Sequence, residues 1–160
     1  MLRRSVVSML TAAVVAVLVG GNSPMFAQSP NPMVGSWTFN AAASKSANPL
    51  PKKRELVITQ KGASIHVDVN ELTATGEALR WSFTTKGDGV AVPVTGWSAV
   101  DTATNTLSGR TGKTVYTKDG KTVMESNTEV SADGQTLVIT GTRMGADGKP
   151  VAYSSHYDRK

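Results

Sequence analysis

Cysteine is absent from this chain, and histidine occurs only twice, as His66 and His156. The lack of cysteine excludes disulfides, thiolate nucleophiles, iron–sulfur clusters and cysteine-ligated zinc. Two histidines are too few for a histidine-rich metal site, and no nucleophile, base and orienting group stand out as a catalytic set. We therefore expect a protein that is not an enzyme and that holds no metal and no cofactor.

Charge is also scarce, since only 18% of the residues are charged and the formal net charge is +5. The one basic cluster, residues 52–54, follows Pro49 and Pro51 and is expected to be a solvated turn before a strand, rather than a phosphate or lipopolysaccharide contact.

Residues 109–114 lack the spacing of a phosphate loop and are predicted to form a hairpin turn. Aromatic residues make up 6% and do not interleave with basic ones, so no nucleic-acid partner is expected.

Residues 1–27 have the pattern of a secretory signal peptide, with Arg3 and Arg4 before an apolar run over residues 6–19. This run is shorter than the ~20 apolar residues of a membrane-spanning helix, and two glycines follow it. We expect cleavage near Gln28, export to the periplasm or the extracellular space, and no integral membrane segment after removal of the signal. The paired arginines leave both the general and the twin-arginine export routes open.

A short Pro-rich segment, residues 28–33, is expected to be a mobile leader, and residues 34–160 to form a single β-barrel domain. Ile65, Val67 and Val69 alternate with polar residues, which is typical of an antiparallel strand with one solvated face. No segment after the leader keeps a helical period. The predicted strands are residues 35–40, 54–60, 64–71, 79–85, 90–95, 104–108, 114–118, 121–130, 136–144 and 150–157.

Asp-Gly pairs recur every 14 residues, at Asp119-Gly120, Asp133-Gly134 and Asp147-Gly148. Asp-Gly is favoured in tight hairpin turns, and this period fits one strand plus its turn, so the strands are expected to be consecutive up-and-down neighbours. An open meander would leave two exposed edges, which closure removes. The sequence predicts an all-β, up-and-down, lipocalin-like barrel of eight to ten antiparallel strands. Four glycines in or beside these strands are expected to permit sharp bends: Gly35, Gly96, Gly109 and Gly141.

Residues 34–39, Val-Gly-Ser-Trp-Thr-Phe, are similar to the Gly-x-Trp opening of the calycins, which comprise lipocalins, fatty-acid-binding proteins and avidins. The resemblance implies that Trp37 plugs one end of a barrel. Residues 156–159 are similar to the end of a fatty-acid-binding protein. Over about 125 residues the chain also resembles small exported bacterial proteins of unassigned function, through its Pro-Val-Thr-Gly, Ser-Ala-Asp-Gly and terminal Tyr-Asp motifs. These resemblances imply a fold and no particular activity.

Two features of fatty-acid-binding proteins are missing. Those proteins hold a ligand carboxylate with an Arg-x-Tyr pair on the last strand, where this chain has Ser155-His156-Tyr157. Residues 41–51 are too short and too rich in proline for the helical lid. Capture of a carboxylate in the family manner is therefore not expected.

Alternation predicts that four aromatic side chains point inward: Trp81, Phe83, Tyr153 and Tyr157. They either line a ligand cavity or fill the barrel. Trp97 follows Gly96 in a loop and is either an exposed contact at the barrel mouth or a lid over the core. Arg143 could supply a charge in place of the missing family arginine, but it lies near a strand end and is expected to be solvated. His66, Asp68 and Arg80 are expected to form a polar ladder on the outer face rather than a metal site. The candidate ligand-binding residues are Trp81, Phe83, Tyr153, Tyr157 and Trp97.

Two functions remain open. The first is a lipocalin-like protein that binds a small apolar or amphipathic ligand inside the barrel. The alternative is a packed barrel that acts through its outer surface, as an envelope scaffold or a protein inhibitor whose leader enters its target. An internal cavity larger than roughly 300 Å³ would favour the first. The identity of the ligand and the oligomeric state do not follow from the sequence.

Overall fold

The computed structural model describes residues 31–145 and 147–160, so the predicted signal peptide lies outside the described residues. These two ranges form ten strands and no helix, so they contain no helix able to cross a membrane. The strands are β1 (Gly35–Ser46), β2 (Lys53–Lys61), β3 (Ser64–Leu72), β4 (Ala78–Thr85), β5 (Asp88–Pro93), β6 (Thr102–Ser108), β7 (Thr111–Lys118), β8 (Lys121–Val130), β9 (Thr136–Met144) and β10 (Pro150–Arg159).

The topology confirms the predicted antiparallel meander. All ten strands belong to one sheet in the order β4-β3-β2-β1-β10-β9-β8-β7-β6-β5, so each strand pairs with its neighbours in sequence and β1 pairs with β10. Two strands are longer than predicted by three residues or more, because β1 continues to Ser46 and β7 begins at Thr111. The added residues are alanine, serine and lysine in β1 and threonine, glycine and lysine in β7, so they lack the alternation of large apolar residues that marks other strands.

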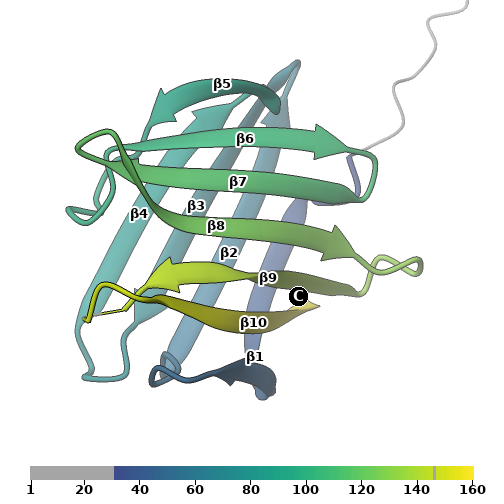
Figure 1. The fold of residues 1–160 in the computed structure, drawn as a ribbon. Coiled ribbons are helices and arrows are strands. Elements are labelled where there is room, and N and C mark those ends of the chain that lie inside the picture. Colours follow the sequence, from purple (N-terminus) through teal and green to yellow (C-terminus); the bar gives the residue numbers. More distant parts are fainter. Residues whose placement is uncertain (1–30, 146) are drawn as a thin grey trace, which may run out of the picture.

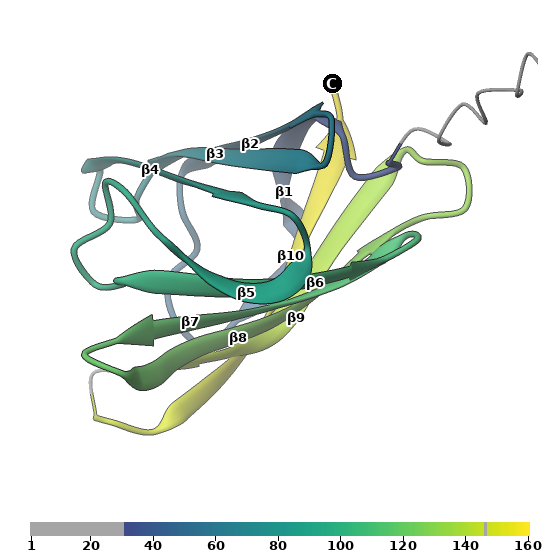
Figure 2. The same cartoon turned by 90° about the horizontal axis from the view of Figure 1, so that it is seen from above.

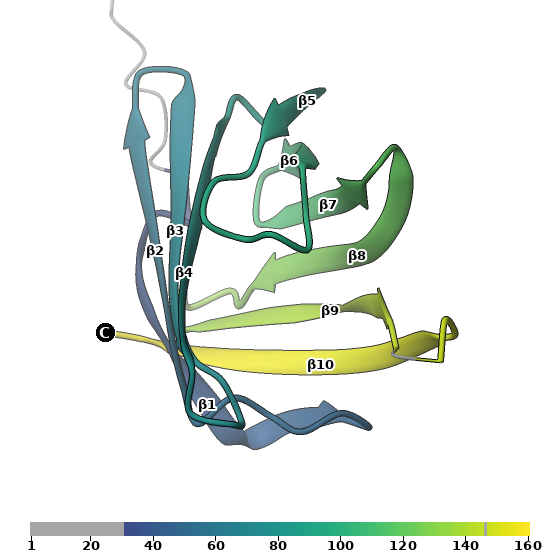
Figure 3. The same ribbon diagram turned by 90° about the vertical axis from the view of Figure 1, so that its left-hand side faces the viewer.

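The sheet is folded into two walls that face each other (Figure 1, Figure 2). β2, β3 and β4 run along one wall, and β6 to β10 cross them at a steep angle on the other (Figure 3). β1 joins the walls, since its first part pairs with both β2 and β10, while Lys45 and Ser46 pair with β10 alone. The register shifts between Asn40 and Lys45, where the strand bends from one wall to the other.

The barrel is nearly closed, and its last contact is small. Between β4 and β5 the only ladder pair among the described residues is an isolated bridge from Ser82 to Thr95, with two backbone hydrogen bonds of 2.9 Å. Gly96 follows this bridge with a φ of +86°, and a Cβ built on it would lie 2.2 Å from the carbonyl oxygen of Arg80. Glycine is therefore required for this segment to reach β4.

The three Asp-Gly pairs lie at hairpin tips, as predicted, but only one forms the expected turn. Asp119 and Gly120 both have positive φ, 50° and 73°, between β7 and β8, which fits a type I′ turn. In the other two pairs only the glycine has positive φ. The Gly134 amide donates to the Ser131 carbonyl at 3.0 Å, so residues 131–134 form a β-turn in which Gly134 is the last residue. This turn lies within a longer hairpin loop, which the Ser131 amide closes by donating to the Thr136 carbonyl.

A core cluster closes one end of the barrel around Trp37, which is 1% exposed. The Trp37 indole N–H donates to the Met33 carbonyl at 2.9 Å, and the Arg159 guanidinium lies 4.1 Å from the ring centroid. Arg159 also donates to the Val34 and Pro32 carbonyls. Trp37 therefore plugs this end, which we call the base, and residues 32–34, the last of the predicted leader and the first of the domain, are tied to it.

Candidate functional site

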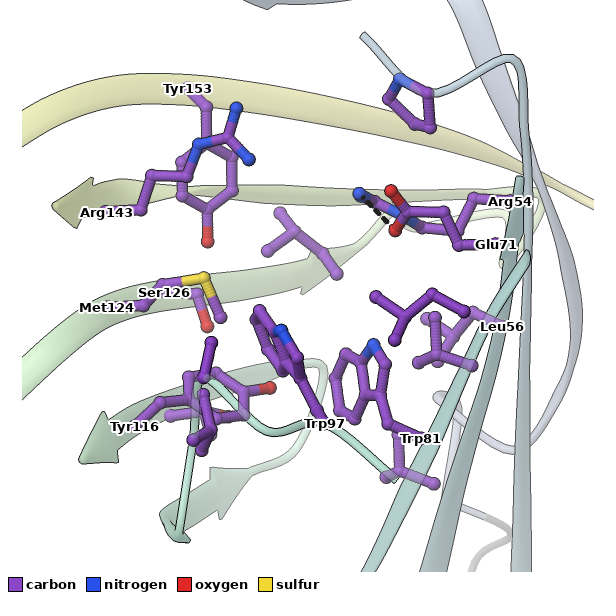
Figure 4. Close-up of a pocket in the computed structure, with 18 of the residues that line it drawn as sticks. Arg54, Leu56, Glu71, Trp81, Trp97, Tyr116, Met124, Ser126, Arg143 and Tyr153 are labelled. Carbon is purple, nitrogen blue, oxygen red and sulfur yellow. Dashed lines mark hydrogen bonds and ion pairs between the residues drawn. The ribbon is translucent and has the colours of Figure 1, made fainter. Parts of the chain in front are cut away.

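The interior of the barrel contains a cavity of about 750 Å³ that is open to solvent. Met33 lies at its base, and loop residues such as Asn48, Thr75 and Gly145 line the opposite end, which we call the mouth. Side chains in the wall are mostly aliphatic or aromatic (Figure 4). This volume lies within the roughly 300–1,000 Å³ of small-molecule sites, so the interior is not simply filled with side chains.

All five predicted site residues line this cavity: Trp81, Phe83, Tyr153, Tyr157 and Trp97. Phe83 and Tyr157 are buried, whereas the other three are half-buried. Whether they bind a ligand stays a prediction.

Four of the aromatic side chains that line the cavity form one cluster: Trp81, Phe83, Trp97 and Tyr116. The Trp81 and Trp97 ring centroids are 5.0 Å apart with an interplanar angle of 28°, and the Tyr116 ring stands edge-on to Trp81 at 5.9 Å. The Phe83 ring is stacked with Trp81 at a centroid distance of 6.2 Å and an interplanar angle of 9°. Trp97 therefore belongs to the cavity wall, and Gly96 directs it there from the closing segment.

A half-buried ion pair lies on the β2–β3 wall. Arg54 and Glu71 are register partners, and both Nε and Nη2 of Arg54 contact Glu71 Oε2, at 2.8 and 2.7 Å. Arg54 Nη1 also donates to the Tyr157 hydroxyl at 3.2 Å. The expectation of a solvated basic turn is wrong for Arg54, whose side chain is only 20% exposed. An Arg–Tyr pair thus exists, with its arginine on β2 rather than on the last strand.

Arg143 and Tyr153 form a second polar group on the opposite wall (Figure 4). Arg143 is half-buried and lines the cavity near its mouth, so it is less exposed than the expectation of a solvated side chain implied. The Asn48 side-chain amide, oriented so that its oxygen accepts, bonds Arg143 Nε and Nη2 at 3.2 and 3.3 Å. Tyr153 points toward Ser126 (Figure 4). Burial raises the pKa of Tyr153 to about 12, so its hydroxyl remains a proton donor at neutral pH.

Gly141 explains how Tyr153 approaches Ser126. The register places Gly141 on β9 between Ser126 on β8 and Tyr153 on β10. A Cβ on Gly141 would lie 1.9 Å from the Glu125 carbonyl oxygen, so glycine lets β8 and β9 come close. With no side chain between them, Tyr153 can lean across β9.

The outer face holds the predicted polar ladder. Arg80 pairs with Asp68 at 2.7 Å, and His66 bonds the Thr84 hydroxyl at 3.0 Å. Within residues 31–145 and 147–160, no three His, Asp or Glu side chains gather as metal ligands do.

The architecture is an up-and-down antiparallel barrel, nearly closed, with the tryptophan of a Gly-x-Trp first strand plugging its base, as the resemblance of residues 34–39 to the calycins implied. No protein-family model and no curated protein matches the chain. Solved structures similar to it include the zebrafish ileal bile-acid-binding protein complexed with cholic acid, at 14% identity and a TM-score of 0.49, covering 81% of this chain and 99% of that one. The siderocalin Ex-FABP, described by its dual ligand specificities, is 17% identical with a TM-score of 0.38 over 81% of this chain and 74% of that one.

Proposed function

We propose that the protein binds a small apolar or amphipathic molecule inside the barrel, and that it does so outside the cytoplasm. The observation that supports binding is the 750 Å³ cavity, whose wall combines an aromatic cluster with a few separate polar groups. Such a combination is typical of small-molecule sites, in which apolar contacts provide affinity and polar groups fix orientation. A barrel that acted only through its outer surface would have no need of this space.

Export rests on the sequence of residues 1–27 alone. It is tested by fractionating cells that make the full chain and sequencing the N-terminus of the protein found outside the cytoplasm. A new N-terminus near Gln28 supports export with cleavage. Retention of residues 1–20 would overturn it.

Binding is tested by native mass spectrometry of the protein purified from its own compartment, followed by titration with the neutral fluorescent probe N-phenyl-1-naphthylamine. We expect a co-purifying small molecule, or saturable binding of one probe per chain after that molecule has been removed. A matched pair of variants locates the site: Trp81→Ala changes the cavity wall, and Arg80→Ala changes the outer face of the same strand. Absence of any saturable binding by a folded, delipidated protein would overturn the proposal.

A further inference from the structure

The charges of the side chains that line the cavity do not cancel. Besides three tyrosines, the charged side chains that line it are Arg54, Glu71 and Arg143. Arg54 and Glu71 neutralise each other at 2.7 Å. Arg143 forms no ion pair among the described residues, so the cavity has a net charge of +1.

Arg143 is also held in place by an uncharged neighbour. The Asn48 amide oxygen contacts Nε and Nη2 of its guanidinium at 3.2 and 3.3 Å, and this neutral partner leaves the charge uncompensated. A guanidinium has five N–H donors, so donors remain after these contacts. The side chain therefore keeps its orientation and still has hydrogen bonds to give.

Tyr153 lies beside Arg143 on the same wall (Figure 4). Its half-buried phenol remains protonated at neutral pH and can donate to an acceptor that the guanidinium also contacts. An anionic oxygen at this position would receive charge-assisted hydrogen bonds, which are stronger than neutral ones. The aromatic wall of Trp81 and Trp97 faces the space next to this group.

We propose that the ligand is an amphipathic monoanion, whose anionic group binds Arg143 and Tyr153 and whose apolar body lies against Trp81 and Trp97. This inference rests on the proposed function and adds the charge of the ligand and the position of its head group. One negative charge matches the net charge of the cavity. The pair formed by Arg54 and Tyr157 is not the anion site, because Glu71 already occupies that guanidinium.

Two probes with the same ring system provide the test. 1-Anilinonaphthalene-8-sulfonate has one sulfonate, and N-phenyl-1-naphthylamine is its neutral counterpart. Each is titrated into the wild type and into Arg143→Gln, Arg143→Lys and Arg110→Gln, with circular dichroism as a check on folding. Arg110 is an exposed residue in the β6–β7 turn at the base, so its variant removes one positive charge far from Arg143.

We expect Arg143→Gln to weaken binding of the sulfonate about tenfold or more, and to change that of the neutral probe less than twofold. Arg143→Lys keeps most of the sulfonate affinity, and Arg110→Gln keeps all of it. Glu71→Gln frees the charge of Arg54 and tightens sulfonate binding several-fold. If Arg143→Gln does not fold, the comparison of the two probes in the wild type still decides, because the sulfonate should bind more tightly and lose this advantage at high salt.

Equal affinity of the wild type for the two probes, or an unchanged sulfonate affinity in folded Arg143→Gln, would overturn the head-group assignment. The proposed function would survive that result as long as the neutral probe still binds in the cavity. Failure of both probes to bind would overturn both proposals.

Discussion

Arg54 and Tyr157 are joined by a hydrogen bond of 3.2 Å between Nη1 and the phenolic oxygen, although 103 residues separate them. The same guanidinium bonds Glu71 across the β2–β3 ladder. The contact links the β2–β3 wall to β10, so the polar groups of the cavity are also part of what holds its walls together.

The Arg54–Glu71 pair should stabilise the fold only while both partners are present. Glu71→Gln leaves a guanidinium with no counter-ion in a largely buried position, and we expect a loss of about 1–3 kcal/mol in the free energy of unfolding. The double variant Arg54→Met/Glu71→Leu should lose less, because the unpaired charge is gone. Urea unfolding of both singles and the double measures the coupling, and additive losses would contradict a specific pairing.

Tyr116 and Tyr153 should lose their phenolic protons at a higher pH than an ordinary tyrosine. Burial raises the pKa values of Tyr116 and Tyr153, that of Tyr153 to about 12. The unfolded chain, with ordinary pKa values near 10, loses these protons first as the pH rises. This contribution to stability is therefore intact below pH 10 and is lost above it, for Tyr153 between about pH 10 and 12.

Absorbance at 295 nm follows this ionisation. At pH 11 the folded protein should show much less phenolate than the same protein in urea. Tyr153→Phe should remove the step near pH 12. A native titration that matches the denatured one, with native circular dichroism, would show that these tyrosines are solvated.

Replacing Gly96 should cost more stability than its positive φ alone implies. Gly62 has a similar positive φ but nothing within 4 Å of a built Cβ, so Gly62→Ala reports the cost of φ, about 1–2 kcal/mol. Gly96→Ala adds a clash with the Arg80 carbonyl, and we expect a total loss of about 2–4 kcal/mol. Thermal unfolding compares the two variants, and equal losses would mean that the closing segment does not press against β4.

Gly96→Ala should also move Trp97 away from Trp81. A red shift of the tryptophan emission, absent in Gly62→Ala, would show increased exposure of the indole rings. An unchanged emission spectrum would place Trp97 independently of this glycine.

Gly134→Val tests the longer hairpin turn between β8 and β9. Gly134 has a φ of +72° and free space around a built Cβ, so a β-branched residue is strained there by its backbone conformation and not by contacts. We expect a loss of about 1–2 kcal/mol, seen as a lower melting temperature. Asp119→Gly serves as the control, since glycine adopts the positive φ of Asp119 without strain and should leave the melting temperature nearly unchanged.

The barrel could be predicted from the sequence because the relevant signals are local. Alternation of apolar residues defined most strands, and the spacing of Asp-Gly pairs gave their connectivity. The same alternation also indicates that two charged side chains point inward, which our sequence analysis did not infer. Arg54 shares a face with Leu56 and Ile58, as Glu71 does with Val69, so both charges could have been placed inside.

Other features required the structure. Tyr116 lies in a strand where threonine and lysine occur on both faces, so alternation gives no direction for its side chain. The position of Trp97 depends on a close approach between Gly96 and β4, which are separated in sequence. The free volume depends on how far the two walls stand apart, and a residue pattern specifies only which side chains face each other.

The central claim, that the cavity is a ligand site, is tested most directly by NMR of isotope-labelled protein saturated with N-phenyl-1-naphthylamine. We predict intermolecular nuclear Overhauser effects from the probe to inward-facing side chains, among them Trp81, Met124 and Tyr153, and none to outer-face residues such as His66 and Thr104. Overhauser effects confined to the outer face, or no saturable change at all in the folded protein, would contradict the account.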